Sequence, residues 1–155
     1  MIEKISEYIE NKKSEMLDFI QMLVNIDSGT SFKAGVDHVG HILSDALEKE
    51  GFSIEIINQA KYGNHIVAKK PGKGKGRILL VGHMDTVFPE GTVKERPFTI
   101  RENRAYGPGV NDMKSGLTSL LYAIKALCTE CSSEMGTITV ILNGDEEVGS
   151  PTSRS

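Results

Sequence analysis

Three short polar clusters carry the residue types that bind metal ions and move protons. They are Gly82-His83-Met84-Asp85, the stretch 107–116 around Asp112, and the stretch 143–150 with Asp145, Glu146 and Glu147. Each follows an apolar, β-branched stretch or precedes a helical stripe, the places where open α/β sheets build their sites. One imidazole and several carboxylates suit zinc or a similar divalent ion. The clusters therefore predict a metal site at one edge of a sheet.

The first cluster pairs a histidine with a carboxylate two positions later. If the strand geometry continues, the side chains of His83 and Asp85 leave the same face. A carboxylate in that place can orient a metal-binding imidazole. The pattern is short, and it also fits a histidine at a strand end that is merely satisfied by its neighbour.

The second cluster superficially resembles a phosphate-binding loop. The Walker pattern requires glycine immediately before its lysine, and here Met113 precedes Lys114, which disfavours nucleotide binding. The glycines allow unusual backbone angles next to Asp112. An acidic residue just before a helix also interacts favourably with the helix dipole. Asp112 is therefore the candidate ligand of this cluster.

The third cluster places three adjacent carboxylates after an apolar strand. Such charges repel one another unless a cation neutralises them, although an ordinary acidic surface turn also explains them. Alternate residues of an extended segment face opposite ways, so Glu146 and Glu147 can take different roles. One can bind metal while the other takes a proton from the water that attacks a carbonyl group.

The elements that must position these clusters follow from hydrophobic periodicity. Apolar residues at helical spacing predict helices over 2–26, from Val36 to a left-handed cap at Gly51, and from Ser115 to Leu127. Strands are predicted over 52–58, 65–70, 77–81 and 137–142, with a hairpin formed by 97–101 and 104–106. Helices that separate apolar strands predict an α/β fold with a mixed, mostly parallel sheet and helices on both faces.

Composition narrows the class of protein. The chain has 155 residues, of which 39% are hydrophobic and 25% charged, as in one globular domain. A net charge of −3 argues against nucleic acid or an anionic membrane as a partner. No apolar run is long enough to span a bilayer. Residues 1–15 are rich in charge and lack the apolar core of a secretory signal, so we expect a cytoplasmic protein.

Three further features have plainer explanations. Cys128 and Cys131 form a lone C-x-x-C, interpreted as two reduced thiols. His38 and His41 are predicted to lie on a solvated helix face, because no other ligand pattern accompanies them. The basic, glycine-rich stretch 69–77 could hold an anion, but a solvated connection between strands is the favoured interpretation.

Taken together, the clusters resemble a known enzyme family. The strings GHMDTV, AYGPGVNDMKSG and NGDEEVGS, with LVNIDSG at 23–29 and RPF at 96–98, are similar to the signature blocks of the zinc-dependent exopeptidases and deacylases. That family includes glutamate carboxypeptidase, acetylornithine deacetylase, succinyl-diaminopimelate desuccinylase and aminoacylase. The sequences of these motifs are most similar to those of the glutamate carboxypeptidase branch.

The resemblance implies a phosphorylase/hydrolase-like fold and a role for each candidate. The metal ligands would be His83 for one ion, Glu147 for the other, and Asp112 between the two. The catalytic residues would be Asp85, which holds the imidazole, and Glu146, the general base that activates a metal-bridged water. Two zinc ions are implied, and cobalt or manganese accept similar ligands.

The resemblance also implies which reaction is catalysed and how much of the catalytic domain this chain contains. The reaction would be metal-dependent hydrolysis of an amide bond in a small peptide or N-acyl amino acid; the alternative is a non-catalytic fragment or paralogue that keeps the fold for binding. The peptide bond after Asp112 would be cis. Because the family pattern continues past the acidic block, residues 1–155 are expected to be the N-terminal part of the catalytic domain, without the lid domain or the remaining ligands. Weak metal binding, little turnover by this chain alone and a homodimer of the full-length protein are further expectations.

Overall fold

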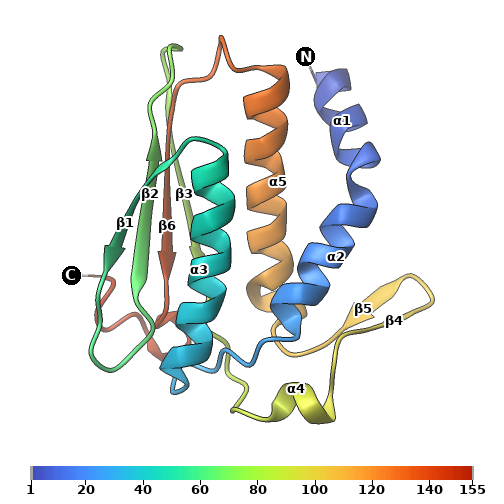
Figure 1. The fold of residues 1–155 in the computed structure, drawn as a ribbon, viewed down its shortest axis with the longest axis vertical. Coiled ribbons are helices and arrows are strands. Elements are labelled where there is room, and N and C mark those ends of the chain that lie inside the picture. Colours follow the sequence, from blue (N-terminus) through green and yellow to red (C-terminus); the bar gives the residue numbers. More distant parts are fainter. Residues whose placement is uncertain (1, 155) are drawn as a thin grey trace.

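A four-stranded sheet with helices packed on one side forms the body of the protein (Figure 1). The computed structural model describes residues 2–154. The helices are α1 (Ile2–Asn11), α2 (Lys13–Val24), α3 (Lys33–Lys49), α4 (Thr92–Glu95) and α5 (Ser115–Glu130). The strands are β1 (Ser53–Ile57), β2 (His65–Lys70), β3 (Arg77–His83), β4 (Thr99–Arg101), β5 (Arg104–Tyr106) and β6 (Thr137–Asn143). The short turn η1 (Val110–Lys114) precedes α5, and the short turn η2 (Glu146–Val148) follows β6.

The predicted elements are present with small shifts in their ends. The helix predicted over 2–26 is divided at Lys12 into α1 and α2. Gly51 follows α3 with a φ of 82°, which confirms the left-handed cap. The predicted hairpin forms a separate two-stranded sheet, β4 and β5, that turns at Glu102 and Asn103.

The sheet is mixed, but it is not mostly parallel. Its order is β1-β2-β6-β3, and only β3 and β6 run parallel. The connection between β1 and β2, residues 58–64, is short and returns the chain beside itself, which suits an antiparallel pair. The parallel pair instead needs a long crossover, which contains α5. The α/β class and the mixed sheet are confirmed, and the predominance of parallel pairs is a wrong prediction for these strands.

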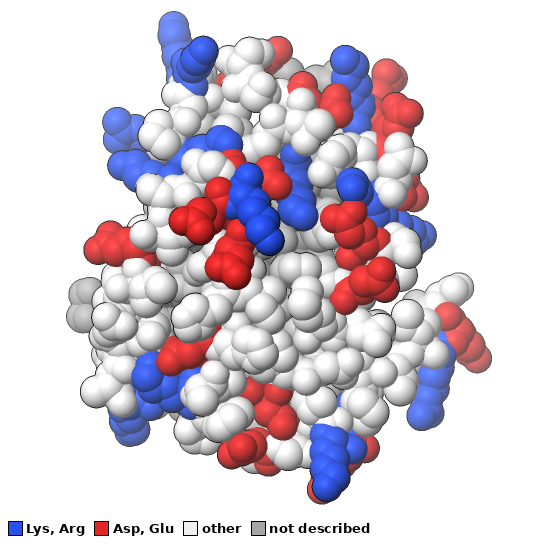
Figure 2. Space-filling model, viewed as in Figure 1, with Lys and Arg blue, Asp and Glu red and all other residues white. Residues whose placement is uncertain are grey.

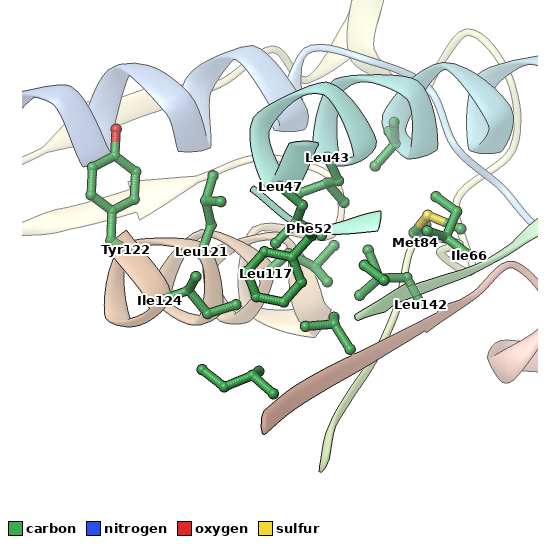
Figure 3. Close-up of a cluster of buried hydrophobic side chains, with 14 of the residues drawn as sticks. Leu43, Leu47, Phe52, Ile66, Met84, Leu117, Leu121, Tyr122, Ile124 and Leu142 are labelled. Carbon is green, nitrogen blue, oxygen red and sulfur yellow. The ribbon is translucent and has the colours of Figure 1, made fainter. Parts of the chain in front are cut away.

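The core lies between the sheet and the pair α3 and α5 (Figure 3). Alternate residues of β6, including Ile138 and Leu142, are buried against Leu117 and Leu121 of α5. The prediction of helices on both faces is wrong for residues 2–154, because α1 and α2 pack against α5 and not on the opposite face of the sheet.

Contacts between helices explain that arrangement. The ring of Phe19 on α2 packs edge-on against Tyr122 of α5, with the ring centres 6.3 Å apart. The Tyr122 hydroxyl donates a hydrogen bond to Glu15, also on α2, at 2.9 Å. These contacts hold α2 beside α5, so Leu79 and Val81 on the other face of β3 remain 59% and 57% exposed.

The surface carries charges of both signs. In the view of Figure 2, acidic and basic side chains alternate over the helices, and no broad basic area covers this face. Within residues 2–154, no helix combines the length and the apolar character that crossing a membrane would require. Because β3 and β6 are parallel, their carboxyl ends meet at one edge of the sheet, where the predicted site residues gather.

Candidate metal centre

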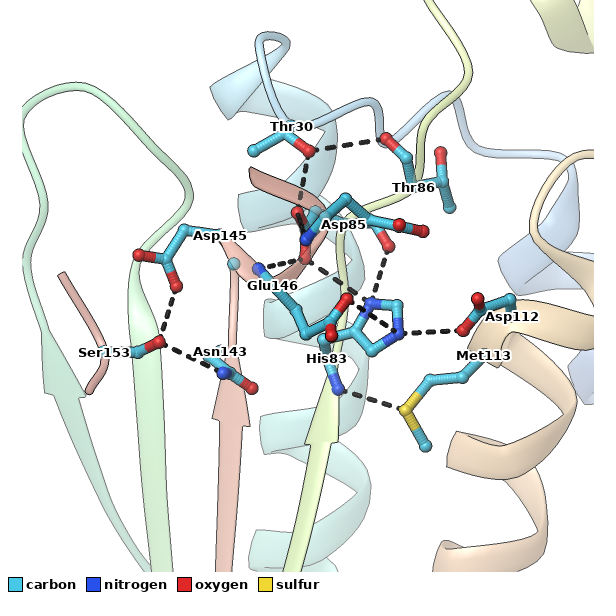
Figure 4. Close-up of polar contacts among 12 residues, drawn as sticks. Thr30, His83, Asp85, Thr86, Asp112, Met113, Asn143, Asp145, Glu146 and Ser153 are labelled. Atoms are coloured by element: carbon cyan, nitrogen blue, oxygen red, sulfur yellow. Dashed lines mark hydrogen bonds and ion pairs between the residues drawn. The ribbon is translucent and has the colours of Figure 1, made fainter. Parts of the chain in front are cut away.

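His83, the last residue of β3, is the centre of the predicted cluster (Figure 4). Its side chain is buried, and its Nε2 lies 2.9 Å from Oδ1 of Asp112. On the other side of the ring, Nδ1 lies 3.0 Å from the backbone oxygen of Asp85 and 3.5 Å from its carboxylate. Asp85 therefore contacts the imidazole chiefly through its main chain, where the resemblance implied the carboxylate.

A kink before α5 brings Asp112 to His83. The backbone of Asp112 and Met113 is non-helical, and the peptide bond between them is cis, as the resemblance implied. Gly109, at the start of this turn, has a φ of 70°, a conformation that favours glycine. The Met113 sulfur accepts a hydrogen bond from the backbone N–H of His83 at 3.2 Å. These contacts connect the turn η1 to the end of β3.

Glu146 and Glu147 lie in the short helical turn η2 and not in an extended segment. The prediction that they face opposite ways as strand residues is therefore wrong. Their carboxylates nevertheless have different positions relative to His83. One carboxylate oxygen of Glu146 lies 3.8 Å from Nε2 of His83. A carboxylate oxygen of Glu147 falls within the same small volume as ligand atoms of His83 and Asp112.

The donor set fits a divalent metal ion. His83, Asp112 and Glu147 each offer one ligand atom, and these atoms all lie within 4.8 Å of one another. One imidazole nitrogen and two carboxylate oxygens are ligands that zinc accepts. The carboxylate of Asp112 is 68% exposed, so it is free to adjust to an ion.

The carboxylates dominate the electrostatics of this cluster. Burial alone would lower the pKa of His83, but hydrogen bonds to Asp85 and Asp112 outweigh it and raise the pKa to about 9. Burial raises the pKa of Glu147, and the charge of Asp112 raises it further. A cation bound among these groups would neutralise the negative charge that the carboxylates bring to the cluster.

The carboxylate of Asp85 is fully buried and organises the site. It accepts hydrogen bonds from the backbone N–H groups of Glu146 at 3.1 Å and Glu147 at 3.2 Å. It also accepts one from the hydroxyl of Thr30 at 2.7 Å (Figure 4). Burial would raise the pKa of Asp85, but the nearby His83 imidazole and these hydrogen bonds lower it. Asp85 thus joins the ends of β3 and β6.

Sequence reasoning missed Thr30 as a contributor to the site. Its backbone N–H donates to the carbonyl of Thr86 at 3.1 Å, and the backbone N–H of Thr86 donates to the carbonyl of Ser28 at 2.9 Å. The loop after α2 is therefore fastened to the chain beyond β3. Thr30 precedes Asp85 by 55 positions, so no local spacing pointed to the pair.

Asp145 is the carboxylate of the third cluster that does not face the metal ligands. It is fully buried and accepts hydrogen bonds from the backbone and hydroxyl of Thr152, at 2.7 and 2.8 Å, and from Ser153 at 2.6 Å. His65, on β2, lies 2.9 Å from the Thr152 hydroxyl and accepts a hydrogen bond from the backbone N–H of Gly144. This network holds the chain around η2, and sequence reasoning gave neither Asp145 nor His65 that role.

Lys114 is buried, with only 1% of its surface exposed, and its ammonium donates to the carbonyl of Ile26 at 2.7 Å. Burial lowers its pKa to about 8, against the opposing charge of Asp27. A lysine enclosed in this way is not available to a phosphate, which agrees with the rejection of a nucleotide-binding loop.

The remaining features match their plainer interpretations. Cys128 and Cys131 are free thiols, and burial raises the pKa of Cys128. His38 and His41 are exposed on α3. In the stretch 69–77, Gly74 donates to the carbonyl of Met135 at 2.9 Å, and Gly72 and Gly74 both pack closely against the turn before β6.

The chain is also similar in sequence to known proteins. Residues 79–155 match the pattern described as peptidase family M20/M25/M40. The chain is 36% identical over 146 residues to carboxypeptidase G2 of Pseudomonas sp. (strain RS-16), covering 93% of this chain and 35% of that protein. It is 33% identical over 138 residues to acetylornithine deacetylase of Vibrio atlanticus (strain LGP32), covering 84% and 36%.

The fold is similar to that of solved structures as well. Human carnosine dipeptidase 1 superimposes with a TM-score of 0.85 at 21% identity, covering 97% of this chain and 36% of that one. The chain therefore spans about a third of the length of the relatives that it matches.

Proposed function

Because the chain belongs to peptidase family M20/M25/M40, we propose that it supplies His83, Asp112 and Glu147 to the metal centre of an enzyme that hydrolyses an amide bond in a peptide or N-acyl amino acid. The observation that carries the proposal is the meeting of their three ligand atoms within 4.8 Å. The relatives' names, a carboxypeptidase and a deacetylase, support the substrate class. In more detail, we propose that the centre would hold two ions, with Asp112 as a ligand of both. Zinc is proposed in preference to cobalt or manganese.

In this proposal the metal ligands and Glu146 have separate roles in the reaction. A bound divalent ion would polarise the substrate carbonyl and make a water molecule more acidic. Glu146, whose carboxylate lies 3.8 Å from the imidazole, takes one proton from the attacking water as its oxygen bonds to the carbonyl carbon. The same proton then goes to the amide nitrogen as the carbon–nitrogen bond breaks.

His83 and Asp85 prepare this arrangement. A metal ligand must be a neutral imidazole, so binding of an ion displaces the proton that His83 holds with a pKa of about 9. Asp85 keeps the ring in place through its backbone carbonyl and keeps both glutamates in place through their N–H groups. A role for Asp85 as a positioning residue follows.

We further propose that residues 1–155 form part of a larger catalytic domain, with a location in the cytoplasm. Support for the first point comes from the relatives, of which the chain spans about a third. Within residues 2–154 each of two ions would have one ligand of its own and a share of Asp112, fewer than the three protein ligands of a catalytic zinc. The purified chain should therefore bind metal weakly and hydrolyse acyl amino acids and dipeptides little.

The test replaces Glu146 by glutamine in the complete protein that contains this chain. Loss of a general base should lower kcat by about 10²–10⁴-fold. Metal content should stay unchanged, because Glu146 is outside the donor set of His83, Asp112 and Glu147. The exposed Glu55, on β1, provides the matched control as Glu55→Gln, with kcat unchanged.

An unaltered hydrolytic rate in Glu146→Gln would remove the mechanism. Absence of hydrolysis in the complete wild-type protein, with metal bound, would favour the alternative of a non-catalytic paralogue. The presence of Glu146 beside His83, which a binding protein would not need, is the observation that favours the enzyme.

A further inference from the structure

A cavity lies near the metal ligands, lined by residues of α4 and of the hairpin of β4 and β5. Its volume is about 470 Å³, within the range of small-molecule sites. Phe88, Gly107 and Val110 line both this cavity and a smaller one of about 240 Å³ that reaches Asp112 and Glu147. The cavity beside the hairpin therefore adjoins the one at the metal ligands.

The lining combines cations with an apolar wall. The residues that line the cavity include two arginines, Arg96 and Arg101, and one acidic residue, Glu95. Arg96 stacks on the ring of Phe88, 5.0 Å from its centre. The rest of the wall is largely apolar and aromatic, and it includes Pro97, Ala105, Tyr106, Pro108 and Val110.

Both guanidinium groups remain available to a ligand. Within residues 2–154, neither Arg96 nor Arg101 has an ion-pair partner in the protein. Guanidinium groups bind carboxylates through paired, charge-assisted hydrogen bonds. The stacking on Phe88 also restricts Arg96 before any ligand arrives, which reduces the entropy lost on binding.

We propose that this cavity is a subsite for an anionic group with an apolar body, held by Arg96 and Arg101 against the wall of Phe88 and Tyr106. The inference rests on the proposed function, because the group would belong to the substrate whose amide bond lies at the metal ligands. It assigns selectivity within that substrate class to the hairpin, which lies outside the metal donor set.

The test measures binding of two matched probes to the 155-residue chain by amide chemical shifts. N-benzoylglycine carries the carboxylate, and N-benzoylglycinamide is its neutral counterpart. A chelator is present throughout, so the carboxylate cannot bind to a metal ion instead. We expect N-benzoylglycine to shift amides of residues 96–110 saturably, and to bind at least about tenfold more tightly than the amide, since one charge-assisted pair suffices for that factor.

Variants of the hairpin and of α4 identify the groups responsible. Arg96→Gln and Arg101→Gln should each weaken N-benzoylglycine several-fold, and the double variant should bind both probes alike. Arg104, on β5 of the same hairpin, does not line the cavity, so Arg104→Gln is the control and should bind as the wild type does. All three side chains are exposed, so the fold should tolerate these changes.

Equal binding of the two probes would overturn the proposal, as would an equal loss in Arg104→Gln. A separate zinc titration of the same variants keeps the two hypotheses apart. Failure of zinc to bind the wild-type chain even weakly, at zinc concentrations in large excess, would count against the metal centre, whereas loss of probe discrimination with zinc binding intact would count against the subsite alone.

Discussion

Asp85 shows how one buried carboxylate can organise a site without being the metal ligand. It accepts hydrogen bonds from Thr30, Glu146 and Glu147, and it is fully enclosed. An asparagine there would point an amide N–H₂ at groups that themselves donate. A buried donor without an acceptor costs free energy comparable to a lost hydrogen bond.

Asp85→Asn should therefore lower the free energy of unfolding by about 2–3 kcal/mol. Urea denaturation of the metal-free chain measures it. Thr30→Val removes the hydrogen bond of the hydroxyl to Asp85 and its longer one, of 3.5 Å, to the carbonyl of Thr86, and should cost about 1 kcal/mol. The exposed Glu55→Gln should leave the free energy of unfolding unchanged. Equal stability of Asp85→Asn and wild type would contradict the positioning role.

The histidine of the site should make stability depend on pH when no metal is bound. The pKa of His83 is about 9 in the folded chain, against 6.5 for an unperturbed histidine. The folded state thus holds a proton that the unfolded state loses between these values, so the contribution is full below pH 6.5 and disappears as pH rises through 9. Its size is up to about 3 kcal/mol.

The measurement is the difference in unfolding free energy between wild type and His83→Gln at pH 6 and at pH 9, with a chelator present. We expect the difference to shrink at the higher pH. Lys114, with its pKa of about 8, titrates in both proteins and cancels in the difference. The exposed His41→Gln is the control, and a difference that does not vary with pH would refute the account.

The turn η1 decides where Asp112 lies, and Gly109 decides the path of η1. A Cβ at this position would lie 2.5 Å from Cγ2 of Thr86, and the φ of 70° is unfavourable for other residues. Gly76 provides a contrast, because a Cβ there would meet nothing within 4 Å.

Gly109→Ala should cost about 2 kcal/mol or more of stability and should weaken zinc binding, since the turn must move and takes Asp112 with it. Urea unfolding and a direct titration with zinc, followed by amide chemical shifts, measure the two effects. Gly76→Ala should alter neither. An unchanged zinc affinity in a destabilised Gly109→Ala would show that η1 does not position the ligand.

The molecule as a whole exposes an apolar strand at one edge of its sheet. β3 pairs only with β6 among the strands of residues 2–154, and its residues Ile78, Leu79 and Val81 are 46%, 59% and 57% exposed. Edge strands with apolar side chains favour pairing between molecules. The chain should therefore self-associate as its concentration rises.

Sedimentation velocity over a wide concentration range tests this expectation. Leu79→Lys combined with Val81→Lys should return the chain to a monomer, because charges on an edge strand oppose pairing. Ile100, similarly exposed on β4, supplies the control as Ile100→Lys, which should leave association intact. A wild-type monomer at every concentration would contradict the prediction.

Local pattern determined the elements and the candidate ligands. Alternation located β2 and β6 almost to the residue, and helical spacing located the start of α5 but ended it three residues early. Residue type at strand ends and before a helix selects His83, Asp112, Glu146 and Glu147. Such features depend on neighbours within a few positions, so the sequence expresses them directly.

Tertiary structure alone decided what depends on distant pairs. The direction of β2 against β6, the uncovered face of β3, and the hydrogen bond from Thr30 to Asp85 each join segments separated by many residues. The different places of Asp145 and Glu147, two acids of like charge only two positions apart, also follow from the network around His65. No local propensity records such contacts, because their free energy comes from packing and hydrogen bonds that exist only when the chain is folded.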